Sequence, residues 1–522
     1  MIHRIALVAV ALSGLGACGG GGSGGGGAPP GWVAGVFDPA SDFEARCAAP
    51  RSGNDPATGQ PFPDVKGSSL DEKNWLRSWS NDLYLWYSEI FDRDPAPYSV
   101  PAYFDLLKTT ATTASGQPKD RFHFTYSTSD WEQLSQSGVT AGYGATWVIL
   151  ASTPPRRVVV AYTEPNYPAT SGSADLVRGT EVKTADGVDV INGTDVDTLN
   201  AAFFPAAANE THTFEVLDPL AAQTRTFAMT SENVTSVPVQ HVEKIATATG
   251  DVGYLLFNDH IATAEQELID AVDTLNAGGG ITDLVLDIRY NGGGYLVIAS
   301  ELAYMIAGAS SVAKTFELPH FNAKHPTTDP VTGQPIEPLP FQTTAVGLSA
   351  MSGAPLPTLN LPRVFVLTGS MTCSASESII NSLEGIGLQV IQIGRTTCGK
   401  PYGFYPQDNC GTTYFTVEFQ GVNAIGFGDY PDGFSPTNTP SNPGVLTPGC
   451  SVGDDFDHDL GNELEARLNA ALEYRRTAGA QCPSPLGPNA LPPAGVTALS
   501  AALPSDGVVK KPEWLQNKIM RR

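Results

Sequence analysis

The sequence predicts a multidomain α/β protein, with a small N-terminal helical domain, then a β domain, then an α/β sandwich as its largest part. Three observations support this prediction. Apolar residues recur at helical spacing from about Leu70. Short β-rich runs broken by Gly and Pro begin at Gly138. From about Val234 to Tyr474, strand-like and helix-like segments alternate, which is typical of a sheet covered by helices.

The composition restricts the possible partners. The chain has 522 residues, which suffices for two to four domains. It holds 54 acidic and 30 basic residues, so its net charge of -24 argues against nucleic acid or an anionic membrane surface as partner. Only 16% of residues are charged while Gly and Pro are plentiful, which indicates a loop-rich globular protein.

The first residues are a targeting signal rather than part of the fold. His3 and Arg4 precede an apolar run too short to span a membrane, so residues 1–17 are predicted to be a signal peptide. The run ends in a sequence that resembles a bacterial lipobox, which implies lipidation of Cys18. An ordinary signal peptide cut nearby is the alternative. We expect a protein of the bacterial cell envelope, lipid-anchored in the outer membrane or facing the periplasm. Residues 18–66, which begin with a Gly/Ser tract, are predicted to be a flexible tether.

Residues 67–137 are predicted to form the helical domain. Ser69 and Glu72 fit a capping box at the start of a helix. His123 lies in a strand-like alternation, and we interpret it as structural rather than catalytic. One helix face carries the large apolar residues Leu76, Trp79, Leu83 and Trp86.

Residues 138–233 change to short strands. Gly142, Tyr143 and Gly144 precede the run Ala145 to Leu150, and further β-rich runs and a short helical stretch follow. This order resembles a PDZ domain of the type found in processing proteases. The resemblance implies that Gly142, Tyr143 and Gly144 form a loop whose N–H groups bind a peptide carboxylate. An unrelated small β domain is the alternative.

Residues 234–475 are predicted to form the α/β sandwich. A Pro-rich insertion at about 310–360 is either a lid or surface decoration, and residues 476–522 are predicted to be a loose tail. Strands are expected at Val252–Phe257, Leu284–Ile288, Val364–Leu367, Gln389–Ile393 and Tyr414–Phe419. Helices are expected around Leu268–Leu275, Tyr295–Ala307, Ile379–Ile386 and Leu464–Leu472.

The segment from Arg363 to Lys400 carries the candidate chemistry. Ser374 stands at a strand-to-helix turn, where the N–H of Ala375 is free to donate to an oxyanion. Lys400 follows one αβ unit later, so the two suit a Ser/Lys nucleophilic site. A lysine acts as a base only when neutral, so burial would have to lower the pKa of Lys400 by several units. A solvated loop lysine is the alternative.

A second motif lies upstream. Asp287 to Gly294 reads DIRYNGGG, and its three glycines follow a buried strand. Glycines let the backbone turn tightly and present N–H groups to a reacting carbonyl. The motif lacks the Lys-Ser/Thr of a phosphate-binding loop, and the segment around Ser374 lacks the G-x-S-x-G elbow of the α/β-hydrolases.

Together these motifs resemble the carboxyl-terminal processing (tail-specific) protease family of serine peptidases, over roughly residues 70–475. The resemblance implies that Ser374 is the nucleophile, Lys400 the general base and Glu377 a supporting residue. It also implies an oxyanion hole formed by the N–H of Ala375 and that of Gly292 or Gly293. The family often has Gln four residues after the lysine, where this chain has Phe404.

If Cys18 is lipidated, six cysteines remain, which an exported protein can pair as disulfides. Cys398 and Cys410 flank one loop and are the predicted pair. A bond between Cys373 and Cys398 is an alternative that would stiffen the site. No CxxC motif is present, and we expect no metal and no cofactor.

We therefore expect a serine endopeptidase that binds the C-terminal tail of exported protein substrates and cleaves them, with no nucleic-acid partner. A non-catalytic peptide-binding lipoprotein on the same scaffold is the alternative. A third possibility is a serine esterase that uses one of the histidines.

Overall fold

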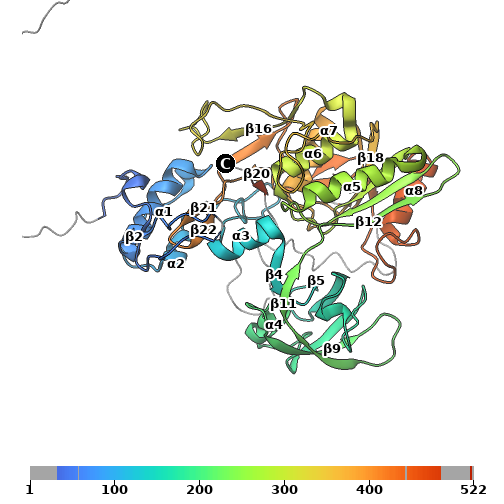
Figure 1. Ribbon diagram of the computed structural model, residues 1–522, viewed down its shortest axis with the longest axis horizontal. Coiled ribbons are helices and arrows are strands. Elements are labelled where there is room, and N and C mark those ends of the chain that lie inside the picture. Colours follow the sequence, from blue (N-terminus) through green and yellow to red (C-terminus); the bar gives the residue numbers. More distant parts are fainter. Residues whose placement is uncertain (1–31, 57, 441–443, 484–517, 520–522) are drawn as a thin grey trace, which may run out of the picture.

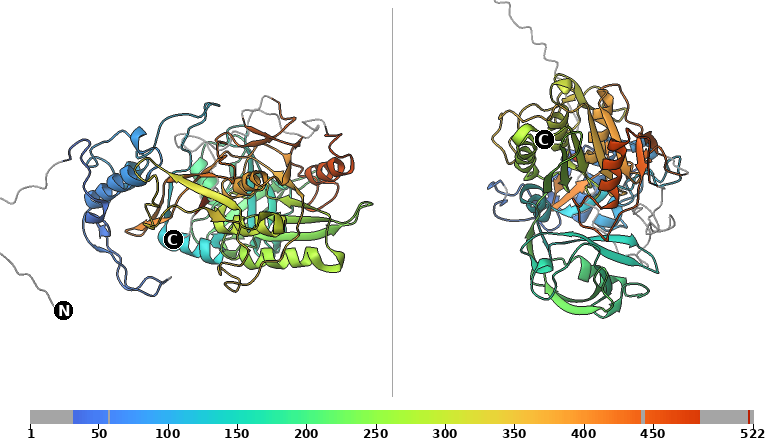
Figure 2. Two further views of the ribbon diagram at one scale, coloured as in Figure 1. Left: turned by 90° about the horizontal axis from the view of Figure 1, so that it is seen from above. Right: turned by 90° about the vertical axis from the view of Figure 1, so that its right-hand side faces the viewer.

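The computed structural model describes residues 32–56, 58–440, 444–483 and 518–519. It is a multidomain α/β structure, as predicted (Figure 1). The core domain lies between the N-terminal helices on one side and α8 (Ala466–Arg476) on the other, and a β domain projects below it (Figures 1 and 2). No helix in these ranges is both long and apolar enough to cross a membrane. The predicted signal peptide, residues 1–17, and Cys18 lie outside the described residues.

The N-terminal helices pack around stacked aromatic side chains. Trp75 and Trp79 have ring centroids 5.1 Å apart, and both are buried. The first helix is capped by Ser68 and Asp71, one residue earlier than the predicted Ser69 box. The helices are α1 (Ser69–Leu83), α2 (Val100–Phe104) and α3 (Thr128–Ser137).

The prediction of a flexible tether over residues 18–66 is wrong for residues 32–66. In that range β1 (Arg46–Cys47) pairs with β2 (Val65–Lys66). Cys47 is buried and forms a disulfide with Cys410, which lies far along the chain. A covalent bond and a short sheet therefore fix this segment, a constraint that local Pro/Gly composition does not reveal.

The β domain is built on one antiparallel sheet with the order β10-β9-β7-β6-β5. The helix α4 (Val196–Phe203) packs on it, and β4 (Val139–Gly142) pairs with β11 (Glu232–Thr235) where the chain enters and leaves. The sheet strands are β5 (Ala145–Ala151), β6 (Arg157–Thr163), β7 (Glu181–Ala185), β8 (Val188–Asp189), β9 (Thr211–Leu217) and β10 (Arg225–Thr230).

The core domain is a six-stranded sheet with the order β12-β13-β14-β18-β19-β26. β12 is antiparallel to β13, and the other neighbours are parallel. The strands are β12 (Val239–Ile245), β13 (Val252–Phe257), β14 (Asp283–Asp287), β18 (Arg363–Thr368), β19 (Gln389–Gly394) and β26 (Gly449–Ser451).

Both faces of this sheet are buried, which explains its apolar strands. In β18, Val364 and Val366 face a cluster formed with three helices, while Phe365 and Leu367 face α8 and strands of the β domain. The three helices are α5 (Ala264–Asn276), α6 (Leu296–Ala307) and α7 (Ala375–Gly385); α8 spans Ala466–Arg476.

Short strands join the core to the N-terminal helices. The predicted strand Tyr414–Phe419 is in fact divided between β22, which pairs with β3 of the N-terminal region, and β23, which pairs with β16. The remaining short strands, some of which pair only among themselves, are β3 (Phe124–Ser127), β16 (Thr315–Phe321), β17 (Leu339–Pro340), β20 (Tyr402–Gly403), β21 (Gln407–Asn409), β22 (Thr412–Phe415), β23 (Phe419–Val422), β24 (Phe434–Pro436) and β25 (Val445–Thr447).

The predicted loose tail is partly ordered. Cys482 forms a disulfide with Cys450 at the edge of the core sheet. Further on, β27 (Lys518–Ile519) pairs with β15 (Gly294–Tyr295). Residues 484–517 and 520–522 lie outside the described residues.

Candidate active site

Three loops meet at one edge of the core sheet. β14, β18 and β19 are adjacent and parallel, so their carboxyl ends lie side by side. The loops that follow them hold residues 288–294, 369–374 and 395–400. Ligands of open α/β sheets commonly bind at this edge. The topology thus brings together Ser374, Lys400 and the glycine motif.

Ser374 adopts an uncommon backbone conformation directly before α7. Its φ of 63° and ψ of -116° are strained for a residue with a side chain. The side chain is fully buried, and within the described part of the chain its Oγ donates no hydrogen bond. The turn sets the hydroxyl at the N-terminus of a helix, where the N–H of Ala375 has no intrahelical acceptor. Such strain at a serine is typical of a nucleophile turn.

The carboxylate of Glu377 ties this turn to the loop of Lys400. It accepts hydrogen bonds from the backbone N–H groups of Ser374 (2.9 Å), Gly399 (2.8 Å) and Lys400 (2.8 Å). It also accepts one from the hydroxyl of Thr397. Burial raises the pKa of Glu377, and these hydrogen bonds act in the opposite direction. One buried side chain therefore sets the relative position of both loops.

A disulfide reinforces the same connection, and it corrects the predicted cysteine pair. Cys398 bonds to Cys373, the residue before Ser374, and not to Cys410. The backbone N–H of Cys398 donates to Thr372 O, which holds the two cysteines close together. Cys410 lies instead in the β21–β22 turn, beside Cys47. The side chains of Cys373, Cys398 and Glu377 lie near enough together to bind one metal ion. The two sulfur atoms are bonded to each other in the disulfide, so neither is a thiolate ligand.

Lys400 is fully buried. Its Nζ lies 4.3 Å from the ring centre of Phe404 and 4.9 Å from that of Phe122. Phe404 occupies the position of the usual family glutamine, so an aromatic face flanks the amine where the family has an amide. Phe122, from the N-terminal region, had not been predicted as part of the site. Its contact depends on tertiary packing, which residue spacing does not reveal.

The glycine loop is held by Asn291. The Asn291 Oδ1 accepts a hydrogen bond from the Gly293 N–H (2.9 Å) and lies 2.9 Å from His260 Nδ1. The carbonyl of Asn291 accepts from the N–H of Cys373 (3.1 Å), which joins this loop to the serine turn. Since the Gly293 N–H is engaged, Gly292 is left as the glycine donor: among the described residues, no group accepts its N–H.

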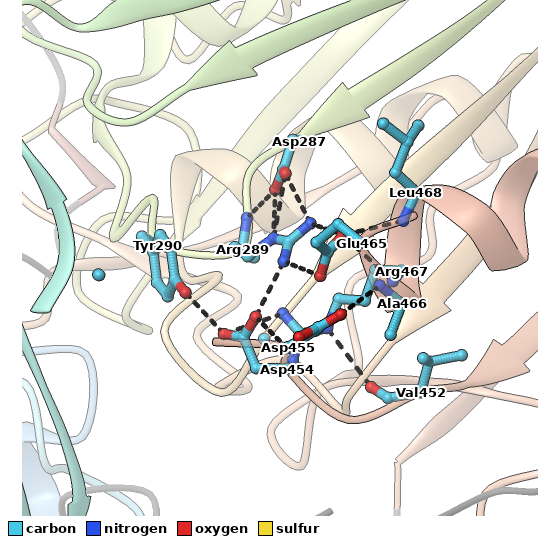
Figure 3. A network of polar contacts seen from close by, with 12 residues as sticks. Asp287, Arg289, Tyr290, Val452, Asp454, Asp455, Glu465, Ala466, Arg467 and Leu468 are labelled. Atoms are coloured by element: carbon cyan, nitrogen blue, oxygen red, sulfur yellow. Dashed lines mark hydrogen bonds and ion pairs between the residues drawn. The ribbon is translucent and has the colours of Figure 1, made fainter. Parts of the chain in front are cut away.

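An ion network holds Arg289 and Tyr290, the two residues that precede Asn291 (Figure 3). The buried Arg289 guanidinium donates to Asp287, Glu465 and Asp454. Burial alone would raise the pKa of Asp454, but the guanidinium groups of Arg467, Arg178 and Arg289 hold it well below its usual range. The Tyr290 hydroxyl donates to Asp454 at 2.7 Å. The two residues before Asn291 are thereby fixed.

Neither buried histidine near this region contacts Ser374. The ring nitrogens of His123 lie 3.0 Å from Thr416 Oγ1 and 2.9 Å from Phe104 O. Burial lowers the pKa of His123 to about 4 and that of His260 to about 3, so both rings are neutral at pH 7. His123 is therefore structural, as predicted.

The predicted carboxylate loop lies elsewhere. Gly142, Tyr143 and Gly144 line a cavity of about 560 Å³ at the junction of the β domain and the core. Its wall includes aromatic residues, and it reaches Tyr290, which directly precedes Asn291. Glu164 also lines it, and burial raises the pKa of this carboxyl to about 7. Tyr290 lines the cavity, and the next residue, Asn291, bonds to the serine turn. This two-residue segment therefore connects the cavity with the serine turn.

The predicted residues Ser374, Ala375, Glu377, Lys400, Gly292 and Gly293 share one site, whereas the pair Cys398–Cys410 does not form. Sequence reasoning missed Phe122, Thr397 and the bond between Asn291 and His260. The position of Asn291 directly before the glycines was the one local signal for its role, because Asn side chains commonly bond backbone two residues ahead.

The chain was compared with known protein families, curated sequences and solved structures. Residues 251–404 match the model of peptidase family S41. A crystal structure of a putative S41 protease from Bacteroides fragilis NCTC 9343 is similar, with a TM-score of 0.57 and 22% identity; the match covers 80% of this chain and 98% of that one. The photosystem II D1 C-terminal processing protease matches with a TM-score of 0.44 and 19% identity, over 77% of this chain and all of that one. No curated protein sequence is significantly similar to the chain.

The match to the family model indicates the class of the protein, a serine-type peptidase. More particularly, its central part, residues 251–404, is similar to peptidase family S41. This assignment favours catalysis over the peptide-binding and esterase alternatives.

Proposed function

We propose that the protein is a serine endopeptidase of the C-terminal processing type, which acts through a dyad of Ser374 and Lys400. The observation that carries the proposal is the shared carboxylate of Glu377, which binds the backbone N–H of both residues at 2.8 to 2.9 Å. The Cys373–Cys398 disulfide joins the same two loops a second time. Two independent ties between a strained serine and a buried lysine suit a preorganised site.

In the proposed reaction, Ser374 Oγ attacks the carbonyl carbon of the scissile peptide bond while neutral Lys400 takes the hydroxyl proton. The N–H groups of Ala375 and Gly292 stabilise the oxyanion of the tetrahedral intermediate. Lys400 then gives its proton to the leaving amine, and an acyl-enzyme remains. A water molecule, deprotonated by Lys400, hydrolyses this ester and regenerates Ser374.

The serine hydroxyl donates to no described residue in this structure, so the hydrogen bond to Lys400 must form in the reactive state. Rotation of one side-chain torsion moves Oγ without disturbing the backbone ties. Catalytic hydrogen bonds are often long or misaligned before substrate binds.

For substrate selection, we infer that the cavity at the β domain receives a peptide C-terminus. The N–H groups of Tyr143 and Gly144 donate to no acceptor among the described residues, so they suit a carboxylate. The apolar wall, with Trp147, Phe203 and Phe204, suits a large apolar final side chain. Lipidation of Cys18 would place this activity in the cell envelope, where exported proteins are the substrates.

Replacement of Ser374 or Lys400 by Ala tests the dyad. We expect turnover of an unfolded protein substrate to fall by about 10³-fold or more in either variant, while the thermal transition is retained. The matched control is Ser382→Ala, which removes a buried hydroxyl from the same helix outside the site. Turnover close to that of the unaltered protein in either Ala variant would refute the proposal.

A further inference from the structure

The segment Lys518–Ile519 forms a strand beside the candidate active site. This strand, β27, is parallel to β15, with Gly294 opposite Lys518 and Tyr295 opposite Ile519. It also lies next to β20, which spans Tyr402–Gly403. A segment from the far end of the chain therefore runs between two elements of the core.

Both neighbours of β27 carry groups of the proposed mechanism. β15 begins directly after Gly292 and Gly293, and β20 begins two residues after Lys400. Strands in a sheet lie about 4.8 Å apart, so backbone paired with β15 passes within reach of the glycine loop. The segment thus lies beside the glycine loop that the proposed mechanism uses.

One edge of β15 is already paired with another part of the core, which leaves its opposite edge for β27. On one side, the Tyr295 N–H donates to His260 O at 2.9 Å, and Gly294 forms a bridge with His260. A Cβ on Gly294 would lie 2.6 Å from His260 O, so only glycine permits this approach. The opposite side of β15 receives β27. An extended peptide that adds to a short strand edge is a common mode of peptide recognition.

The positive charge of residues 508–522 also favours binding of this segment beside β15 and β20. Residues 508–522 contain five Lys or Arg residues and one acidic residue, in a chain whose net charge is -24. In β20, burial and the carboxylates of Asp429, Asp120 and Asp432 raise the pKa of Tyr402, while the Arg121 guanidinium lowers it, so three carboxylates and one guanidinium act on this residue. A basic segment is attracted to such surroundings, and the attraction weakens as salt is added.

From this placement we propose that the segment around Lys518–Ile519 is a built-in inhibitor that occupies the substrate-backbone position on β15. A substrate must displace it before cleavage begins. The inhibitory role rests on the proposed peptidase function, whereas the docking itself does not. Because the segment is covalently linked, its effective concentration at the site is high even if its intrinsic affinity is modest.

A binding experiment tests the docking independently of catalysis. In the Ser374→Ala background, a chain ending at Gly507 is compared with the full chain for binding a fluorescent peptide of residues 508–522. We expect the truncated chain to bind the peptide about tenfold or more tightly than the full chain, because its own segment no longer competes. A full-length variant with Lys518→Pro and Ile519→Pro serves the same purpose if truncation impairs folding, because proline cannot donate to a strand ladder.

The matched control is the same peptide with prolines at the positions of Lys518 and Ile519, which is expected not to bind. Equal binding of the unaltered peptide to the truncated and full chains, or binding of the proline peptide as tight as that of the unaltered one, would overturn the docking.

An activity comparison then tests inhibition. With Ser374 intact, truncation is expected to raise kcat/KM for a short peptide substrate several-fold, and added peptide 508–522 to inhibit competitively. Unchanged kcat/KM after truncation would refute the inhibitory role. If both chains are inactive, the peptidase proposal fails, while the binding comparison still decides the docking.

Discussion

At the scale of single residues, Glu377 is the centre of the site although it takes no part in bond making. Each of its oxygens accepts bonds from two groups: Oε1 from Thr397 and Gly399, Oε2 from Ser374 and Lys400. A carboxylate meets four donors in this way because it is an acceptor at both oxygens.

Glu377→Gln is therefore predicted to misplace the dyad. The amide turns one acceptor into a donor, which leaves buried N–H groups unpaired at a cost of about 1 to 3 kcal/mol. We expect kcat to fall by about 10- to 100-fold with little change in KM. The rate of covalent labelling at Ser374 by a serine-directed reagent should fall in parallel. A loss of thermal stability without any loss of labelling rate would show that Glu377 stabilises the fold but does not position the dyad.

At the scale of elements, the Cys373–Cys398 disulfide makes the serine turn and the lysine loop one unit. We predict that the double variant Cys373→Ala/Cys398→Ala loses activity, because the two loops are then held by hydrogen bonds alone. The matched control is Cys47→Ala/Cys410→Ala, which removes a disulfide that joins neither the serine turn nor the lysine loop. Each variant should lose about 2 to 5 kcal/mol of stability. Equal activity in the two variants, measured where both are folded, would contradict the role in the site.

The insertion at about 310–360 is anchored by two carboxyl groups rather than left as a free lid. Glu265 on α5 accepts from the N–H groups of Gly347, Ser349 and Ala350, and Glu301 on α6 accepts from that of Val346. Burial and the neighbouring Glu265 raise the pKa of Glu301 to about 8.

This pair predicts a pH-dependent stability. Below pH 4.5, the ordinary pKa of the group, Glu301 is protonated in both states and has no effect. As the pH rises from 4.5 to about 8, the unfolded state ionises while the folded state keeps its proton, so the free energy of unfolding falls. In Glu301→Gln, this decrease in the free energy of unfolding, on the order of a few kcal/mol, should be absent. Urea denaturation at pH 6 and pH 9 measures it, and an identical pH response in the variant would contradict the account.

The elements also show what the sequence allows one to predict. The strands before the three site loops were predicted within about a residue, because buried parallel strands have continuous apolar runs. The division of the predicted strand Tyr414–Phe419 into two was not predicted, because the pairing partner changes from β3 to β16 within one alternating run. Disulfide partners such as Cys47 and Cys410, separated by 363 positions, depend on tertiary structure.

At the scale of the whole molecule, Arg178 connects the β domain to the glycine loop. Its guanidinium donates to the Tyr290 hydroxyl (2.8 Å) and to Asp454 (2.8 Å), both in the core domain. Sequence motifs identified the two domains, but this contact joins residues that no local pattern relates.

We predict that Arg178→Met weakens both stability and activity. The Asp454 side chain, which is 14% exposed, would lose one of its cations. Breaking a buried pair commonly costs about 3 to 5 kcal/mol, and a partly exposed partner places the cost at the lower end of that range. The neighbouring Arg157→Met is the control, because Arg157 forms a partly exposed pair with Glu181 inside the β domain. Thermal unfolding and kcat/KM measure the effects. An unchanged melting temperature in Arg178→Met would show that Arg178 does not join the domains energetically.

The central claim is that Ser374 forms an acyl-enzyme with the help of Lys400. Intact mass spectrometry after reaction with a small activated ester, followed by peptide mapping, tests it most directly. We predict one acyl group on Ser374, formed far more slowly in Lys400→Ala and absent in Ser374→Ala. An acyl group on another residue, or equal acylation rates in the unaltered chain and Lys400→Ala, would contradict the account.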